Sequence, residues 1–404
     1  MNEKIKTALV AVLAVITIAL SAATIIAPKK AYSEQENRYL EERPVLSAES
    51  VLDGSYMKDT ETYVSDHFIL RDVFMTVRAG YERLTGRNRV NGVYLCDDGY
   101  YIEEYKGLQN VSRIVAAVTR LNERCESANI RAVLVPTAVS VYDDKLPATA
   151  KGADQEADRQ AVMRAVLEKM GGLGNSGDTV ADSAGQKAGE TPEAEGTGRS
   201  FAWVDVSEAL QGAKEEQLFY KLDHHWTTYG AYVAYREIIK SFGFTPFERS
   251  QFTERVVSTE FKGTFASKVN DLLAKPDTIT AFESDRLALT VSYPDRKITT
   301  DTLYAPDYLT KKDKYSFFLN NQNTFIEIHN ANAQSGRTLA VVKDSYANCL
   351  IPFLAEHFST IYVFDTRYYR GKVTDFINQN GVTDVLFLYN MYTIDTDTGI
   401  NGVQ

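Results

Sequence analysis

The sequence predicts an α/β fold, in which a parallel sheet is covered by helices on both faces. Short, continuous apolar runs occur at residues 131–136, 338–343 and 384–389. Such runs are typical of strands that are buried on both faces, because successive side chains of a strand point to opposite sides of the sheet. Segments with apolar residues at helical spacing, such as 111–128 and 229–240, alternate with these runs. This alternation favours a doubly wound arrangement of helices around one sheet.

The first 30 residues contain a segment that fits a membrane span. Residues 8–27 form a run of 20 residues without a charged side chain, which is the length that a helix needs to cross the hydrocarbon core of a bilayer. The basic pair Lys29-Lys30 stands where a signal peptide would be cleaved, so an uncleaved anchor is favoured over a cleaved signal peptide. A short N-terminal tail before a long body normally leaves the body outside the cytoplasm. We therefore predict a single-pass protein of the cell membrane with an extracytoplasmic body.

The remaining chain is expected to form a short proximal segment and one large domain. Residues 31–90 combine charged and aromatic residues in a pattern that indicates packed helices close to the membrane. A hairpin at 93–102 opens the α/β domain, which we expect to extend over residues 91–404. Within it, residues 171–198 are rich in glycine, small polar and acidic residues and contain no aromatic residue. Because such a segment cannot bury enough apolar surface to order itself, a disordered insertion is predicted there.

Composition restricts the partners and cofactors of the protein. The chain of 404 residues has a net charge of −10, which argues against nucleic acid as a partner because phosphates are neutralised by a basic surface. The three cysteines, Cys96, Cys125 and Cys349, form no disulfide framework. Neither they nor the scattered histidines show the spacing of metal ligands. No metal and no other cofactor is therefore predicted.

The consecutive residues Asp223, His224, His225 and Trp226 carry the clearest chemical signal. A catalytic histidine needs a fixed tautomer, and a carboxylate that accepts a hydrogen bond from its Nδ1 supplies it. Residues two apart lie on the same side of an extended segment, so Asp223 can orient His225 in a loop that leads into the helix at 229–240. His224 then points the other way and is expected to be structural, while Trp226 walls the site. An Asp-x-His pair alone nevertheless arises by chance more often than as a catalytic dyad.

A candidate nucleophile, Ser345, follows the predicted strand 338–343 and begins an apolar segment. A serine at this place presents its hydroxyl above the sheet and its N–H toward a developing negative charge. In open parallel sheets, ligands bind outside the carboxyl ends of the strands. The neighbouring strands at 361–365 and 384–389 end close to further polar residues. We expect oxyanion or substrate binding by Asn390, Arg367 and Tyr368, with Trp226 beside them.

These segments resemble those of a known family. Asp223-His224-His225-Trp226 is the motif that gives its name to the DHHW family of bacterial cell-surface proteins. Further resemblance to that family lies in Glu36-Asn37-Arg38, Ser65-Asp66-His67-Phe68, the hairpin at 93–102 and Lys343-Asp344-Ser345-Tyr346. The family in turn resembles the SGNH-hydrolase-like alginate O-acetyltransferases, in which an Asp-x-His pair precedes the nucleophilic serine. The sequence departs from the Gly-Asp-Ser block of such enzymes at Lys343, and no Gly-x-Asn-Asp block is evident.

The resemblance implies both a fold and an activity. The fold would be an SGNH-hydrolase-like, flavodoxin-like domain of three layers. The activity would be the transfer of an acyl group, most simply acetyl, to a cell-surface polysaccharide, with Ser345 as nucleophile, His225 as base and Asp223 as its orienting acid. A membrane-bound O-acyltransferase is implied as the acyl donor. Two alternatives stay open: a carbohydrate acetylesterase with the same triad, and a non-catalytic cell-envelope partner of a membrane O-acyltransferase.

Overall fold

The structure is a computed structural model that describes residues 3–33, 38–150, 152–171, 199–271 and 273–403. The chain divides into two compact units, Met1–Asn91 with Ala266–Ala274, and Gly92–Phe265 with Lys275–Gln404. The sequence did not indicate that residues 266–274 group with the first unit. All of the insertion expected at 171–198 except Gly171 lies outside the described residues.

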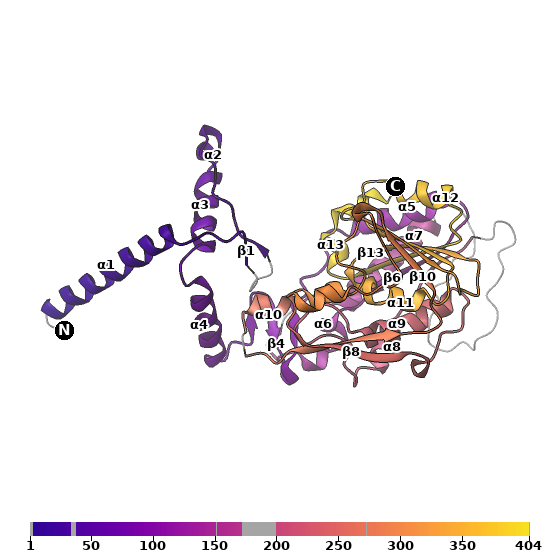
Figure 1. Cartoon of the computed structure of the whole chain (residues 1–404), viewed down its shortest axis with the longest axis horizontal. Helices are drawn as coiled ribbons and strands as arrows, with labels where there is room; N and C mark the ends of the chain where they lie inside the picture. The colour runs from indigo at the N-terminus through magenta and orange to yellow at the C-terminus, as the bar shows by residue number, and fades with distance from the viewer. Residues whose placement is uncertain (1–2, 34–37, 151, 172–198, 272, 404) are drawn as a thin grey trace. The chain divides into compact units, whose positions relative to one another are not determined.

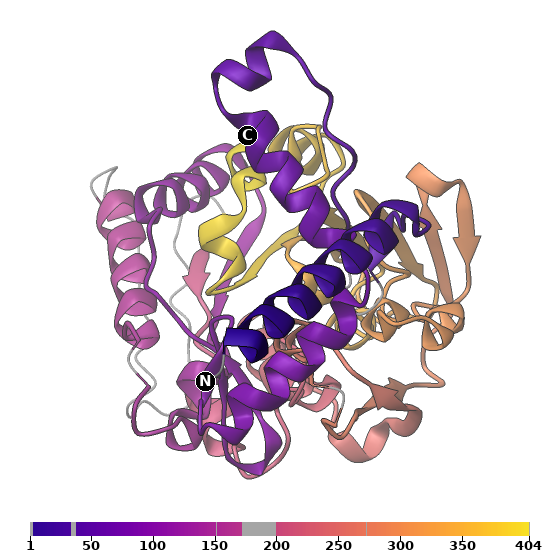
Figure 2. The ribbon, with the colours of Figure 1, turned by 90° about the vertical axis from the view of Figure 1, so that its left-hand side faces the viewer.

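The first unit begins with an uninterrupted helix, α1 (Glu3–Ile26) (Figures 1 and 2). Its mean hydropathy of 2.7 and its 24 residues make it long and apolar enough to cross a membrane. The helical character expected for residues 31–90 is also observed. The further elements are β1 (Tyr32–Ser33), β2 (Arg38–Tyr39), α2 (Ala48–Leu52), α3 (Ser55–Asp66), α4 (Arg71–Leu84) and β3 (Arg89–Val90).

The second unit is built on an eight-stranded sheet with the strand order β11-β10-β12-β14-β13-β15-β6-β7. Five neighbouring strands run parallel: β14 (Thr360–Asp365), β13 (Thr338–Lys343), β15 (Asp384–Asn390), β6 (Asn129–Val135) and β7 (Phe201–Trp203). The strands predicted from the apolar runs are therefore confirmed. The hairpin predicted at 93–102 is present as β4 (Val93–Leu95) and β5 (Tyr101–Glu103).

The sheet is mixed rather than wholly parallel. The strands β12 (Phe325–Asn330), β10 (Leu289–Tyr293) and β11 (Ile298–Thr300) extend it in antiparallel fashion beyond β14. Residues of β10 and β12 alternate between buried and more exposed positions, and no residue of β11 is buried, whereas every residue of β15 is buried. Antiparallel edge strands can leave one face open to solvent, so they lack the continuous apolar runs by which the parallel strands were recognised. A separate two-stranded ribbon consists of β8 (Thr253–Phe261) and β9 (Asp277–Glu283).

Helices cover both faces of the sheet (Figure 1). On one face lie α5 (Val111–Arg124), α7 (Gln155–Gly171) and α12 (Val373–Gln379), and on the other α8 (Ser207–Gly212), α9 (Thr228–Ser241) and α11 (Ile351–Leu354). Alternate residues of the central strand β15 enter the two cores: Val385 and Phe387 pack with the first set, Leu386 and Leu388 with the second. This three-layer arrangement confirms the predicted α/β fold with helices on both faces of the sheet. The short helices α6 (Ala138–Val141), α10 (Thr264–Val269) and α13 (Thr393–Thr396) lie in connections.

One buried histidine of this core has a consequence for acid stability. The Nε2 of His357 lies 2.7 Å from the hydroxyl of Tyr235, which itself accepts a hydrogen bond from the Phe247 N–H. The Tyr235 hydroxyl therefore donates to a neutral imidazole. Burial, assisted by the nearby Arg286, lowers the pKa of His357 from 6.5 to about 4.

We expect this histidine to make the protein less stable as the pH falls from 6.5 toward 4. In that range the unfolded chain binds a proton at His357 that the folded chain does not bind, so stability rises with pH, by up to about 3 kcal/mol in total. His357→Gln, which keeps an acceptor for Tyr235 but does not titrate, should lose less stability on acidification. Thermal unfolding of both proteins at pH 7.5 and 5 tests this, and an equal loss in both would contradict it.

Candidate active site

The loop that carries Asp223 and His225 is a narrow, hydrogen-bonded turn before α9. Tyr220 N–H donates to the carbonyl of His225 at 3.1 Å, and Thr227 N–H donates to that of Leu218 at 2.8 Å. Thr227 caps α9 by accepting from Gly230 N–H at 3.1 Å. A Cβ at Gly230 would lie 2.2 Å from the Leu218 carbonyl oxygen, so only glycine permits this close return of the chain. The loop is thereby fixed at the edge of the sheet.

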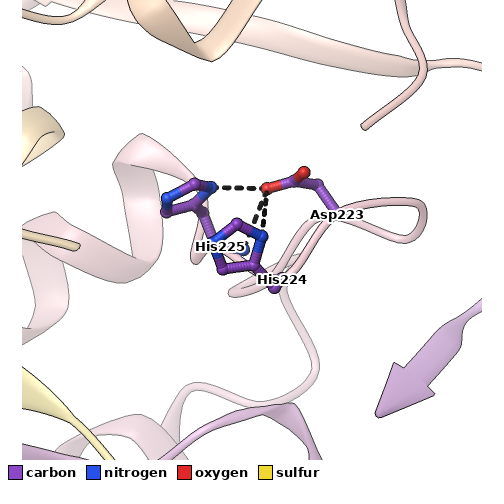
Figure 3. Close-up of side chains that lie close together, drawn as sticks. All are labelled: Asp223, His224 and His225. Atoms are coloured by element: carbon purple, nitrogen blue, oxygen red, sulfur yellow. Dashed lines mark hydrogen bonds and ion pairs between the residues drawn. The ribbon is translucent and has the colours of Figure 1, made fainter. Parts of the chain in front are cut away.

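The three residues predicted as a triad are linked by two hydrogen-bond contacts, with His225 in the middle. Asp223 Oδ1 is 2.5 Å from His225 Nδ1, and His225 Nε2 is 2.8 Å from Ser345 Oγ. Figure 3 shows the imidazole rings of His225 and His224 turned toward one oxygen of Asp223. Asp223 and His225 are buried, while Ser345 is partly exposed. The arrangement can remove the proton of the serine hydroxyl and hold it on a histidine that is oriented from behind.

Ser345 obtains its position from the strand that precedes it. It directly follows Asp344 at the end of β13 and starts a 3₁₀ helix (Ser345–Cys349) before α11. Pro352 stands in the first turn of α11, in agreement with the irregular start that the sequence predicts. Asp344 caps the 3₁₀ helix by accepting from Tyr346 N–H at 2.8 Å. Among the described residues, the N–H of Ser345 makes no hydrogen bond, so it is available to an oxyanion on the acyl group.

The second oxygen of Asp223 is bound by residues that the sequence did not single out. Thr264 donates to Oδ2 from its backbone N–H at 2.8 Å and from its hydroxyl at 3.1 Å. The His225 N–H donates to Oδ1 at 3.0 Å. Gly263, which precedes Thr264, brings the chain directly against Asp223. No sequence signal distinguishes this glycine and threonine from those of an ordinary turn.

A substitution at Gly263 tests whether its close contact with Asp223 is needed to position the carboxylate. A Cβ at this position would lie 2.2 Å from Oδ2 of Asp223, and the backbone of the loop leaves the carboxylate little room to withdraw. We expect Gly263→Ala to displace Asp223 and lower kcat for an acyl ester about 10²-fold, since a misplacement of about 1 Å has this cost. Gly336→Ala is the matched control, because its Cβ would meet no atom within 4 Å. Equal kcat values for the two variants would contradict the assignment.

The protonation states of the dyad suit a resting general base. Although burial alone would oppose ionisation, the two histidines and their hydrogen bonds hold the pKa of Asp223 well below its usual value. Burial, with a contribution from His224, lowers the pKa of His225 below its ordinary value of 6.5. At neutral pH the imidazole is therefore neutral and its Nε2 can accept the serine proton.

One aromatic side chain stacks directly on the imidazole. The ring of Tyr315 lies on that of His225 at 3.6 Å between centroids and 11° between planes, and its hydroxyl donates to the Ser345 carbonyl at 3.0 Å. Trp226, expected to wall the site, is fully buried and donates from Nε1 to the carbonyl of Tyr346 at 2.8 Å. Tyr315 was not among the expected site residues, because a single tyrosine in a turn-rich stretch carries no signal.

Asn390, expected to bind the oxyanion, lies at the end of β15 but its amide is already used. Nδ2 donates to Asp344 at 2.6 Å and to Thr393 at 2.8 Å, while Oδ1 accepts from the N–H groups of Tyr392 and Thr393. Because both amide hydrogens have acceptors, Asn390 is placed to fix Asp344 rather than to donate to a substrate oxygen. Asp344 in turn precedes Ser345, so Asn390 acts on the site through the turn.

Arg367 and Tyr368 lie after β14, at the same edge of the sheet. The guanidinium of Arg367 binds both oxygens of Asp365, at 2.8 and 2.6 Å, and its side chain remains 29% exposed. Tyr368 is exposed and its ring lies 5.4 Å from the Arg367 guanidinium carbon. Lys343, which replaces the glycine of the related motif, is buried and bridges Asp365 and Asn348. It therefore ties β14 to the turn that carries Ser345.

Asp223, His224 and His225 together are a possible metal-binding group, since their ligand atoms lie within 4.8 Å of one another. The distance between Asp223 and His225 fits a hydrogen bond between them better than a metal ion bound by both. Two ligand atoms of a tetrahedral zinc site, each about 2.0 Å from the metal, stand more than 3 Å apart, whereas Asp223 Oδ1 and His225 Nδ1 are separated by 2.5 Å. His224 Nδ1 lies 2.8 Å from the hydroxyl of Thr264. Its role here is to hold Thr264 against Asp223.

A small hollow of about 30 Å³ opens beside the site. It is lined by His224, Phe265, Tyr346, Asn390 and Tyr392, among others. All of these residues belong to the second unit. The hollow has about the volume of one water molecule, and it lies beside His224 and Tyr346, which adjoin His225 and Ser345 in the chain.

Comparison with known proteins supports the family resemblance and the fold. A family model described as "DHHW protein" matches residues 195–364, which include all three triad residues. The crystal structure of a DHHW family protein from Eubacterium siraeum is 24% identical, covers 78% of this chain and 96% of that chain, and has a TM-score of 0.62. The resemblance to the DHHW family predicted from the sequence is confirmed.

Two structures of PatB1 from Bacillus cereus share the fold as well. The one with a sulfonyl adduct is 17% identical, covers 75% of this chain and 95% of that chain, and has a TM-score of 0.56. The other is 19% identical, covers 74% and 95%, and has the same TM-score of 0.56. No curated protein matches the chain in sequence.

Proposed function

We propose that this protein is an extracytoplasmic O-acetyltransferase that acts on a cell-surface polysaccharide through Ser345, His225 and Asp223. The observation that carries the proposal is the unbroken chain of contacts from Asp223 through His225 to the partly exposed Ser345 hydroxyl. PatB1, which has the same fold, has been observed with a sulfonyl adduct, and sulfonyl reagents form such adducts with activated nucleophiles. A sulfonyl reagent is therefore a suitable probe for the proposed nucleophile of this chain.

The reaction would proceed in two transfers. His225 Nε2 takes the proton of Ser345 while Oγ attacks the carbonyl carbon of the acetyl donor. The Ser345 N–H stabilises the negative oxygen, and collapse of the intermediate expels the donor group, which takes the proton from His225. A sugar hydroxyl then gives its proton to His225 and attacks the acetyl-serine. Its product is the acetylated sugar, and Ser345 recovers its proton.

Water could replace the sugar hydroxyl in the second transfer, since Ser345 is partly exposed. The protein would then be a carbohydrate acetylesterase with the same triad. The acyl-enzyme is common to both reactions, so only the fate of the acetyl group distinguishes them.

The proposed location and donor follow from the N-terminal helix. α1 would anchor the protein in the membrane with the second unit outside the cytoplasm. Common activated acetyl groups are cytoplasmic, so a membrane-bound O-acyltransferase would deliver the acetyl group to Ser345. This donor is the partner that the proposed reaction requires.

The test uses the full chain in detergent micelles with 4-nitrophenyl acetate as donor and short oligosaccharides as acceptors. We expect release of 4-nitrophenol together with a mass increase of one acetyl group on the oligosaccharide, and neither with Ser345→Ala. Release without transfer to any acceptor would favour the esterase. A wild-type chain that neither releases 4-nitrophenol nor transfers acetyl would contradict a catalytic role and favour the non-catalytic partner.

A further inference from the structure

A larger cavity lies in the second unit, at the same edge of the sheet as the triad. Its volume is about 530 Å³, which is within the range of pockets that bind small ligands. Pro136, which directly follows β6, and Ser207 and Glu208, which begin α8 after β7, are among the residues that line it. The cavity therefore opens at the carboxyl ends of β6 and β7, where ligands of such sheets bind.

One lining residue of this cavity also borders the hollow beside the site. Val139 lines both the cavity and the small hollow beside His224 and Tyr346. In the sheet, β15 separates β13, which ends before Ser345, from β6. Two strand spacings of about 4.8 Å place the cavity roughly 10 Å from the nucleophile along the edge. An extended oligosaccharide can therefore occupy the cavity while one of its hydroxyls reaches Ser345.

The lining of the cavity selects among saccharides by charge. Asp143, Asp154, Glu156 and Glu208 contribute four carboxylates, and no lysine or arginine is found among the described lining residues. Glu156 is paired with the buried Arg159, whereas no ion pair of Asp143 or Glu208 is present in the part of the chain that the structure describes. A ligand with carboxylates or phosphates would be repelled, while hydroxyl and ammonium groups can donate to these oxygens.

The rest of the wall is mainly apolar. Val139, Leu146 and Ala150 line the cavity, together with small exposed parts of the buried Tyr94 and Tyr105. Tyr105 is fixed by a hydrogen bond from its hydroxyl to Asp158 at 2.9 Å. Apolar walls with a few placed polar groups are typical of ligand pockets.

We propose that this cavity binds the acceptor polysaccharide, and that the acceptor is uncharged or carries amino groups rather than carboxylates or phosphates. The inference rests on the proposed acetyl transfer by Ser345 and specifies its acceptor. Sugar units whose hydroxyl or ammonium groups donate to the four carboxylates direct the adjoining unit of the polymer toward the hollow at His224. There its hydroxyl meets the acetyl-serine.

The experiment compares acceptors of different charge with the full chain in detergent micelles and 4-nitrophenyl acetate as donor. The acceptors are the β-1,4-linked tetramer of glucosamine, cellotetraose and the tetramer of galacturonic acid. We expect acetylation of the first two and at least 10-fold less of the third. In the double variant Asp143→Lys with Glu208→Lys, the ratio of transfer to 4-nitrophenol release should fall at least 10-fold for the glucosamine tetramer and rise for the galacturonate tetramer.

Controls separate failure of this inference from failure of the proposed function. Asp301→Lys changes an exposed aspartate that does not line the cavity, and it should leave both ratios unchanged. Ratios in the double variant equal to those of the wild type, or equal acetylation of all three acceptors, would overturn the inference. If the wild type releases no 4-nitrophenol, the proposed function fails instead. Calorimetric titration of the glucosamine tetramer into wild type and double variant then still decides whether the cavity binds it.

Discussion

Replacing Ser345 by alanine is expected to lower kcat for 4-nitrophenyl acetate by about 10⁴-fold or more, because the acyl-enzyme can no longer form. The change removes only the hydroxyl that lies 2.8 Å from His225 Nε2. The 3₁₀ helix that begins at Ser345 is capped by the side chain of Asp344, so the turn does not depend on that hydroxyl. The loss should therefore appear in kcat without a comparable loss of stability, as measured by steady-state kinetics and thermal unfolding.

Ser292→Ala serves as the matched control, because this serine lies on β10 outside the site. Its kcat should stay within a factor of about two of the wild type, as expected for a substitution remote from the chemistry. If Ser345→Ala kept wild-type turnover, Ser345 would not be the nucleophile, even though its hydroxyl contacts His225.

Asp223→Asn should be nearly as damaging, with kcat reduced about 10⁴-fold at neutral pH. Each carboxylate oxygen accepts from a backbone N–H, Oδ1 from His225 and Oδ2 from Thr264. Whichever way the new amide is turned, its NH₂ group therefore faces a donor. With the NH₂ toward His225, Nδ1 must accept and Nε2 carries the proton, so the imidazole cannot take the proton of Ser345.

The NH₂ group of the new asparagine also faces a buried backbone N–H, that of His225 or that of Thr264. Two donors that face each other should lower the free energy of unfolding by about 1–3 kcal/mol. Asp384→Asn provides the control, since Asp384 is equally buried but pairs with Arg337 at the start of β15. It should lose stability without losing more than a few-fold in kcat. If Asp223→Asn shows only the same loss of stability and keeps its kcat, Asp223 is a structural residue and not the orienting acid.

The parallel part of the fold could be predicted because burial on both faces leaves a signal in the sequence. The runs that become β6, β13 and β15 are continuously apolar, and the helices between them have a regular period. The antiparallel strands β10 and β12 gave no comparable signal, because their alternating burial places polar residues between apolar ones, and β11 has no buried residue. Their hairpin and return to β14 depend on tertiary contacts, which no local pattern encodes.

In the site, too, residues within one local pattern could be predicted, whereas residues that depend on tertiary contacts could not. The loop with Asp223 and His225 was recognisable because both residues act within one short segment, and Ser345 because it follows a clear strand. Thr264 and Tyr315 could not be found, since their importance arises only when segments 40 and 90 residues downstream of the loop fold against it. Asn390 was expected at the correct edge of the sheet, yet its hydrogen bonds with Asp344 and Thr393 could not be foreseen from its position alone.

The most direct measurement of the central claim is covalent labelling of the full chain with an aryl sulfonyl fluoride, followed by peptide mass spectrometry. The account predicts one sulfonyl group on Ser345, formed at least 100-fold more slowly in His225→Ala because the hydroxyl then lacks its base. Absence of label at Ser345, or labelling at the same rate without His225, would contradict the claim that these two residues form a catalytic pair.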